Sequence, residues 1–386
     1  MRNRYLDLLR FLAIIRVVVY HATGWAFLTL AFPAMSVMFA LAGSLMAASL
    51  DRSGPAAVGR RLRRLLPSLW MLAAVFVPAM LVTGLAVNWR LVFWALPLSD
   101  PPSNGWGALA LSTIWYLRDY LWFVLLSPLA LPLFRRFPVP TVIAPYVLLV
   151  AVEFGLLPAN EVVQDIGLYF GAWLLGFAHH DGMLRRMPRR VLVALSTALS
   201  GLGAAWILTH PGPRGFDIND IRLGNALWSI GFVLILLGLA PARAAWIDRN
   251  ALVSRAVTVL NQRALTIYLW HMPILLGIIT VTVRLGWGAL TPSGIALRLT
   301  GLAVLLALAV ALFGWVEDLA AQRRLAVVPG PRRAADAPLV TADAAVTPGR
   351  VTAGAGARAR PDDPALRPTD APVVAGPRAT VSGASP

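Results

Sequence analysis

The chain of 386 residues is 58% hydrophobic and 13% charged, whereas a soluble domain averages about 45–50% apolar and about 25% charged residues. It contains no cysteine, and all 34 of its basic residues are arginine, which excludes disulfides, thiol catalysis and a Schiff-base lysine. A polytopic all-α membrane protein is predicted. Arginines beside anionic lipid head groups explain the net charge of +16 without a nucleic-acid partner.

Windows of about 20 apolar residues predict about ten transmembrane helices in a bundle. They are expected near 8–30, 33–50, 66–87, 116–134, 140–157, 164–180, 191–209, 225–241, 264–286 and 295–316. The first helix is expected to remain as an anchor, because its apolar run continues past Trp25 without a small-residue cleavage site. The segment 88–115 is apolar enough to dip into the interface without spanning.

The loop arginines predict an orientation, because cytoplasmic loops of membrane proteins are enriched in basic residues. With the N-terminus inside, the cytoplasmic loops hold Arg52, Arg60, Arg61, Arg63, Arg64, Arg135, Arg136, Arg185, Arg186, Arg189, Arg190, Arg243, Arg249, Arg255 and Arg263. The opposite loops hold Arg90, Arg118, Arg214, Arg222 and Arg284, together with Asp100, Glu161, Asp165, Asp217 and Asp220. This asymmetry favours ten spans with both termini in the cytoplasm.

The chain changes composition near residue 326. The membrane domain is expected to cover 1–325. Residues 326–386 are rich in Ala, Pro, Gly, Arg, Thr and Asp and have almost no aromatic side chains, so they cannot bury enough apolar surface to fold. A disordered cytoplasmic tail is predicted there.

The first predicted helix carries Arg10, Arg16 and His21 in an apolar sequence. A charge at the centre of a bilayer costs roughly 2.5 kcal/mol or more, and by default it marks a functional site. Arg10 and His21 are eleven residues apart, about 20° from three full turns, so we expect both on one face and about 16 Å apart. Arg10 would lie near the cytoplasmic surface, within reach of Asp7, and His21 deep in the membrane, while Arg16 points elsewhere.

That separation is comparable to an extended pantetheine arm. A cofactor whose phosphates meet Arg10 could therefore present a thioester to His21, a hypothesis that rests on spacing alone. The structural alternatives are a core histidine at His21, a snorkelling anchor at Arg10 and an ion pair between Arg16 and an acid such as Glu153.

Four stretches resemble the acyltransferase family 3 membrane proteins, a family of integral membrane O-acyltransferases. Arg10 and His21 within LDLLRFLAIIRVVVYH resemble the first-helix Arg-x10-His motif of that family. MFALAGSLM (38–46) is similar to its second helix, RRLRRLLPSLW (60–70) to its cytoplasmic basic loop, and LTIYLWHMPIL (265–275) to its late helix. The resemblance covers 1–325. LDLLRFLA and WYLRDYLWF (115–123) depart from the family pattern, which bears on the acceptor side more than on the chemistry.

The resemblance implies that the protein transfers an acyl group, often acetyl, from cytoplasmic acyl-CoA (acetyl-CoA) as donor substrate. The implied acceptor is a hydroxyl of a carbohydrate, a lipid-linked sugar or a secondary metabolite. The implied location is the bacterial inner membrane, as a multi-pass protein. We expect no permanently bound cofactor and no metal, since no metal-ligand spacing or nucleotide fingerprint is present.

Residue roles follow from the chemistry and from the resemblance. An imidazole that titrates near neutral pH suits a general base, which makes His21 the catalytic candidate, with Arg10 to orient acyl-CoA. Arg61 and Arg64 would meet the phosphates of CoA, because guanidinium groups suit phosphate geometry, although RRLRR is also a common positive-inside signal. The oxyanion needs a donor, which Arg16 or Tyr268 could supply.

Three further features carry open alternatives. Asp119 forms either a simple pair with Arg118 or, by the resemblance, part of the acceptor site. His271, next to Trp270, is either a hydrogen-bonded histidine at a helix kink or an acceptor contact. The run HHD (179–181) is interpreted as a polar helix end rather than a metal site, because adjacent helical residues point in different directions.

A rival function is a secondary transporter that exports a small molecule or an acylated product through the same polar cavity. Transporters commonly carry inverted repeats with broken helices in matching positions, and the sequence shows no such symmetry. A degenerate scaffold is a third possibility, which the presence of both Arg10 and His21 argues against.

Overall fold

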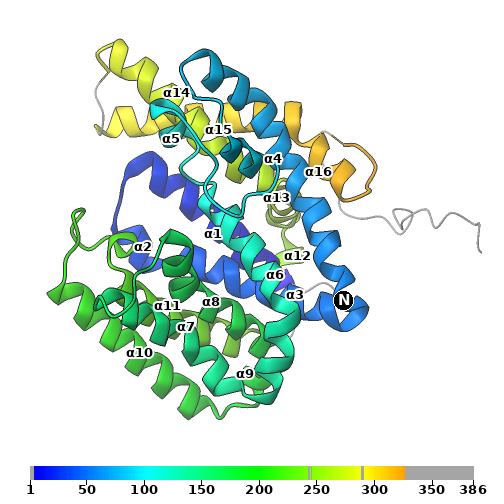
Figure 1. The fold of residues 1–386 in the computed structure, drawn as a ribbon, viewed down its shortest axis with the longest axis vertical. Helices are drawn as coiled ribbons and strands as arrows, with labels where there is room; N and C mark the ends of the chain where they lie inside the picture. Colours follow the sequence, from blue (N-terminus) through cyan, green and yellow to red (C-terminus); the bar gives the residue numbers. More distant parts are fainter. Residues whose placement is uncertain (1–3, 242–243, 245, 288–290, 327–386) are drawn as a thin grey trace, which may run out of the picture. The chain divides into compact units, whose positions relative to one another are not determined.

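The computed structural model describes residues 4–241, 244, 246–287 and 291–326. The regular structure of these residues is helical (Figure 1). Ten of the helices overlap the ten segments predicted from the sequence: α1 (Arg4–Thr23), α3 (Ala34–Ser53), α4 (Ala56–Val82), α6 (Trp115–Arg136), α7 (Pro138–Glu153), α8 (Glu161–His180), α10 (Arg189–Thr209), α11 (Arg222–Gly238), α14 (Ala264–Arg284) and α15 (Pro292–Phe313). α4 begins at Ala56 instead of near residue 66. The predicted tail lies outside the described residues, except for residue 326.

Shorter helices connect these long ones. They are α2 (Phe27–Ala31), η1 (Trp89–Trp94), α5 (Gly105–Ala110), α9 (Met183–Arg186), η2 (Ile218–Asp220), α12 (Trp246–Arg249), α13 (Ala251–Gln262) and α16 (Trp315–Ala320). The segment predicted to dip into the interface, 88–115, forms η1 and α5, and both are too short to cross a bilayer.

Six helical segments of the described residues are long and apolar enough to cross a membrane. They are Phe27–Ser53, Ala56–Val82, Trp115–Arg136, Arg189–Thr209, Ala264–Arg284 and Pro292–Phe313. α7 and α11 are apolar but shorter, and α1 carries Asp7, Arg10 and Arg16 within its 20 residues. The protein is therefore a multi-pass membrane protein of the all-α class.

α1 is shorter than predicted. It ends at Thr23 instead of near residue 30, because Gly24 adopts a left-handed φ of 71° and its N–H bonds to the Tyr20 carbonyl at 2.7 Å, a helix stop that glycine makes at low cost. His21 consequently lies in the last turn of the helix, and its expected position deep in the membrane stays a prediction.

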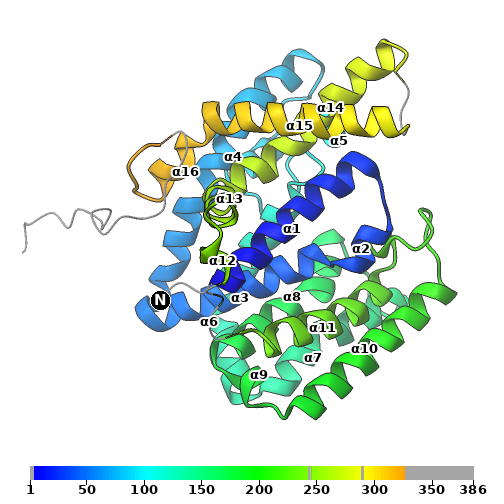
Figure 2. The same ribbon diagram turned by 180° about the vertical axis from the view of Figure 1, so that it is seen from behind.

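α1 lies between the α14–α15 pair and the α3–α8 pair (Figures 1 and 2). α3 and α8 approach so closely that a Cβ on Gly43 would lie 2.1 Å from the Trp173 carbonyl oxygen, and one on Gly176 would lie 2.1 Å from that of Ala40. Glycine is needed at both positions, as in close-packed membrane helices. This contact holds α3, and with it α1, at a fixed depth in the bundle.

Candidate functional site

A cavity of about 790 Å³ lies at the end of α1 where the helix stops. α1 contributes Arg16, Tyr20 and His21 to its lining. The remaining walls come from the segment between Trp94 and Arg118, the first half of α8, the 214–222 segment and Tyr268 on α14. Segments far apart in the sequence therefore meet around His21.

His21 is held by a second histidine. The Nε2 atom of His271, on α14, lies 3.1 Å from Nδ1 of His21, and Nδ1 of His271 lies 2.6 Å from the Tyr268 carbonyl oxygen. A carbonyl oxygen only accepts hydrogen bonds, so Nδ1 of His271 carries the proton and donates to it. Nε2 of neutral His271 then accepts a hydrogen bond from the N–H at Nδ1 of His21. In neutral His21 the lone pair is then on Nε2.

His271 is fully buried and is not among the residues that line the described cavity. Of the two predicted alternatives, the structure places it as a hydrogen-bonded histidine and not as a direct wall of the cavity. His271 forms a hydrogen bond with His21 from outside the cavity lining. The sequence could not indicate this contact, because the two residues are 250 positions apart.

Arg16 lines the same cavity as His21, so the expectation that it points elsewhere is wrong. Its Nε donates to the Leu28 carbonyl at 3.0 Å, and its guanidinium lies 5.0 Å from the centre of the Tyr20 ring. The break after α1 brings Leu28 back beside Arg16. Glu153, the acid named in the ion-pair alternative for Arg16, is exposed at the end of α7.

Arg10 lies toward the other end of α1 and is not among the residues that line the described cavity. Its guanidinium is within electrostatic range of Asp7, Arg61, Tyr116 and Tyr120. Asp7 also pairs with Arg4, at 3.9 Å. Arg10 and His21 thus occupy two separate environments at the two ends of one continuous helix.

Arg61 and Arg64 share the environment of Arg10 but differ in their contacts. Arg61 donates to the Leu45 carbonyl at 2.8 Å, to Ser49 Oγ at 3.2 Å and to the Tyr120 hydroxyl at 3.3 Å, and so clamps α4 against α3. Arg64 is exposed and lies in the electrostatic range of Arg61 and Tyr120. The basic group on this side therefore combines a structural arginine with an accessible one.

Asp119 and Arg118 form more than a simple pair. Both are 1% exposed, and Arg118 Nε donates to Asp119 Oδ1 at 3.0 Å. Arg118 also pairs with Asp100 at 2.5 Å, with Glu161 at 3.6 Å and with Asp165. Arg118 lines the cavity, whereas Asp119 lies behind it. The predicted acceptor contact of Asp119 is thus at most indirect, through Arg118.

Tyr268 lines the cavity, as expected for a residue near the reacting atoms. Its hydroxyl donates to the Thr113 carbonyl at 3.1 Å, and its ring lies 5.0 Å from that of Tyr116. The hydroxyl proton is therefore already used in holding the loop before α6 against α14.

Sequence reasoning missed Tyr20, Asp217 and Arg214. The Tyr20 hydroxyl donates to Asp217 Oδ2 at 2.5 Å and accepts from Arg214 Nη1 at 2.7 Å. Arg214 also binds both carboxylate oxygens of Asp220, which lowers the pKa of Asp220 and raises that of Arg214. We call this group the outer clasp. The only sequence signal was that Tyr20 adjoins His21.

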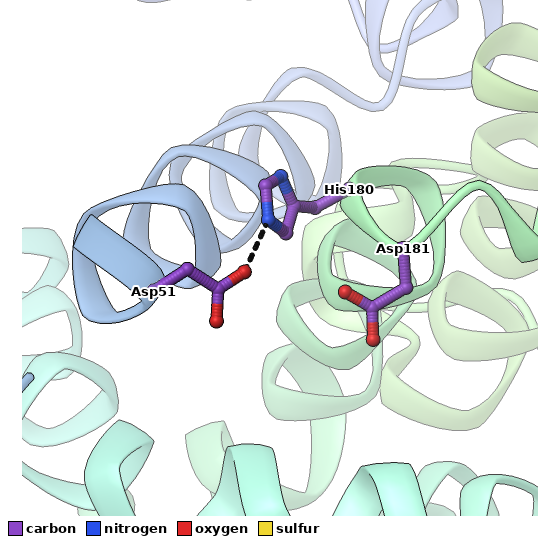
Figure 3. Close-up of side chains that lie close together, drawn as sticks. All are labelled: Asp51, His180 and Asp181. Atoms are coloured by element: carbon purple, nitrogen blue, oxygen red, sulfur yellow. Dashed lines mark hydrogen bonds and ion pairs between the residues drawn. The ribbon is translucent and has the colours of Figure 1, made fainter. Parts of the chain in front are cut away.

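The HHD run forms a polar group at the ends of α3, α6 and α8 (Figure 3). His179 bonds Ser44 Oγ at 3.0 Å, while His180 Nε2 lies 2.8 Å from Asp51 Oδ2. Side-chain atoms of Asp51, His180 and Asp181 that could ligate a metal lie within 4.8 Å of one another. Arg135 donates hydrogen bonds of 2.8–2.9 Å to the carboxylates of both Asp51 and Asp181, so a metal ion would have to displace its guanidinium group. This geometry favours an ion-pair clasp between helix ends.

The family described as Acyltransferase domain matches residues 3–315, a span that contains the cavity, the two histidines and the basic group around Arg10. No curated protein and no solved structure matches the chain.

Proposed function

The chain belongs to the acyltransferase family 3 domain family, and from this premise we propose that it is a membrane O-acyltransferase with His21 as its general base. The donor is acyl-CoA, often acetyl-CoA, and the acceptor is a hydroxyl of a carbohydrate, a lipid-linked sugar or a natural product. The hydrogen-bonded chain from the Tyr268 carbonyl through His271 to His21 is the observation that carries the proposal.

In this mechanism, His21 Nε2 takes the proton of the acceptor hydroxyl as its oxygen attacks the thioester carbon. The carbon–sulfur bond breaks as the tetrahedral intermediate collapses, and the imidazolium returns the proton to the departing thiolate. His271 accepts the hydrogen bond from Nδ1 throughout, so it fixes the ring orientation and stabilises the charged form of His21.

Arg16 is the better of the two oxyanion donors. The hydroxyl proton of Tyr268 is used on the Thr113 carbonyl. Arg16 donates to the Leu28 carbonyl through Nε. Its two terminal NH2 groups can therefore donate to negative charge that develops in the cavity, which Arg16 and His21 both line.

The other end of α1 supports donor binding. Arg10 and Arg64 lie in one basic group beside Tyr120, and guanidinium groups bind phosphates well. Arg10 and His21 are separated by about 16 Å along the helix, comparable to a pantetheine arm, so phosphates at this group would let the thioester reach His21. Arg61 is a structural clamp in this arrangement.

We further propose ten membrane spans, both termini in the cytoplasm and a bacterial inner-membrane location. Six of the ten spans are the long apolar segments described above, and the other four would be α1, α7, α8 and α11. The arginine asymmetry of the loops supports an orientation with the Arg10 end of α1 inside. The same orientation directs the cavity, with Arg214 and Asp100 on its rim, to the opposite side, where the acceptor would enter.

The test measures thiol release from acetyl-CoA and propionyl-CoA by purified protein in detergent, with and without envelope extract. We expect release that requires the extract and falls by about 10²–10⁴-fold in His21→Ala. His210→Ala is the matched control, because His210 is an exposed histidine at the end of α10. Unchanged turnover in His21→Ala contradicts its role as base. If no acyl-CoA is either bound or cleaved under any condition, the exporter is favoured.

A further inference from the structure

One wall of the cavity is acidic in a chain whose net charge is +16. We define the acidic wall as Asp100, Glu161 and Asp165, the carboxylates that line the cavity around Arg118; Asp119, which also pairs with Arg118, lies behind them. One guanidinium cannot neutralise four carboxylates, and Arg222 is the other cation close to them, within range of Asp165. The carboxylates around Arg118 therefore outnumber the arginines close to them.

The other arginines that line the cavity, Arg16 and Arg214, have their contacts outside the acidic wall. Arg214 is matched by Asp217 and Asp220 in the outer clasp, and Arg16 lies beside Tyr20 and Leu28. Cationic and acidic groups thus face different parts of one cavity.

Two observations indicate that Arg118 does not satisfy all the carboxylates around it. Behind the wall, Asp119 Oδ2 is buried and accepts no hydrogen bond from any residue that the structure describes, a costly state for a carboxylate oxygen. Burial also raises the pKa of Asp100, against the attraction of Arg118. Arg118 alone therefore does not fully stabilise the charged form of Asp100, and a further cation beside it would favour that form.

Aromatic rings complete this part of the cavity. Trp94, Trp115 and Tyr169 line it, and the Trp115 and Tyr169 rings stack at 5.5 Å. Aromatic faces attract cations and pack against the apolar faces of sugar rings. The combination of excess carboxylates and aromatic rings suits a ligand that carries both a positive charge and hydroxyl groups.

We propose that the acidic wall binds a protonated amino group of the acceptor, so that the acceptor class is an amine-bearing sugar or a similar amino alcohol. The inference rests on the proposed function, because it takes the cavity beside His21 as the acceptor site. The ammonium group would be held at the wall while a hydroxyl of the same molecule faces His21. An acceptor with a phosphate or carboxylate at this position is disfavoured.

The test compares three ligands that share the glucose ring and differ in charge: one cationic, one neutral and one anionic. Binding of glucosamine, N-acetylglucosamine and glucose 6-phosphate is measured by calorimetry on the purified full chain in detergent, without acyl-CoA and below the pKa of the sugar amine. We expect glucosamine to bind roughly tenfold more tightly than N-acetylglucosamine, because charge-assisted hydrogen bonds are about twice as strong as neutral ones.

Two neutral variants of the same size locate the effect. Asp165→Asn and Glu161→Gln should lower the affinity for glucosamine several-fold and leave that for N-acetylglucosamine unchanged. Glu161→Gln protects the test against misfolding, since Glu161 is 78% exposed and only 3.6 Å from Arg118 as an ion pair. Glu153→Gln, at an exposed glutamate of α7, is the matched control.

Three results overturn the inference: equal affinity for the two amino sugar derivatives, no binding of glucosamine, or preference for glucose 6-phosphate. Glucosamine preference without thiol release in any assay supports the binding of an ammonium group at the acidic wall and removes the proposed function. Thiol release without an amine preference does the reverse, so the two failures are distinguishable.

Discussion

His271 Nε2 and His21 Nδ1 lie 3.1 Å apart on helices α14 and α1, and the Tyr268 carbonyl fixes which of them donates. The carbonyl orients His271 and His271 orients His21, so the base that we propose depends on a residue outside the cavity wall. The two histidines therefore have different roles, which single substitutions can distinguish. His21 exchanges the proton with the substrate, and His271 positions the His21 ring.

We expect His271→Ala to lower kcat for thiol release and to leave KM for acyl-CoA unchanged, because it alters the orientation of His21 and not the donor site. His271→Gln, whose side-chain oxygen can accept the hydrogen bond from Nδ1 of His21, should recover part of the loss. The measurement is steady-state thiol release for both variants. A change confined to KM, or equal loss in both variants, contradicts a positioning role.

Tyr20→Phe should loosen the outer clasp without disturbing α1, since only the hydroxyl between Asp217 and Arg214 is lost. Hydrogen bonds to charged groups contribute roughly 1.5–3 kcal/mol each, so trypsin cleavage after Arg214 should become faster and thiol release weaker. The readouts are fragment formation on a timed digest and turnover. Tyr5→Phe is the control, because Tyr5 lies at the other end of α1 and its hydroxyl donates to the Leu236 carbonyl on α11. Equal digestion of both variants would show that Tyr20 does not anchor this segment.

The basic group near Tyr120 predicts different effects for neighbouring arginines. Arg64→Ala should raise KM for acetyl-CoA with little change in stability, because Arg64 is exposed and faces solvent. Arg63→Ala, also exposed and in the same run of α4, is the matched control. The comparison uses KM at low and high salt, since a phosphate contact should weaken as salt screens it. Equal KM values for the two variants would remove Arg64 from the donor site.

Glu317 in α16 predicts a pH dependence of stability. Burial raises its pKa above the ordinary 4.5, against hydrogen bonds from Thr266 to Glu317 Oε1 at 2.5 and 2.8 Å. The folded state is therefore penalised by ionisation: stability is full below the unfolded pKa and is lost as the pH rises through the folded pKa.

Glu317→Gln keeps an oxygen to accept from Thr266 and removes the charge. We expect its Tm, relative to wild type, to be higher at pH 8 than at pH 5, as measured by thermal unfolding in detergent. Glu153→Gln, at an exposed position, should show no such trend. A Glu317→Gln variant with the pH dependence of wild type would mean that Glu317 is not the group that titrates.

The sequence by itself determined ten segments that each overlap a long helix, with Arg10 and His21 on the first of them, but not where α1 and α4 begin and end. Both follow from local rules: hydropathy is read over about 20 neighbouring residues, and helix geometry relates residues within a segment. The family followed from short motifs of the same local kind. Even so, the glycine stop at Gly24 shortened the first helix and moved His21 to its last turn.

Tertiary structure decided what surrounds His21. The partner histidine on α14, the acidic wall around Arg118 and the outer clasp on Tyr20 join side chains from segments far apart in the chain. Hydropathy and spacing carry no information about such pairings, because they depend on how close-packed helices such as α3 and α8 set the depth and rotation of their neighbours. The chemistry of the site is thus encoded locally in α1, and its geometry is decided by packing.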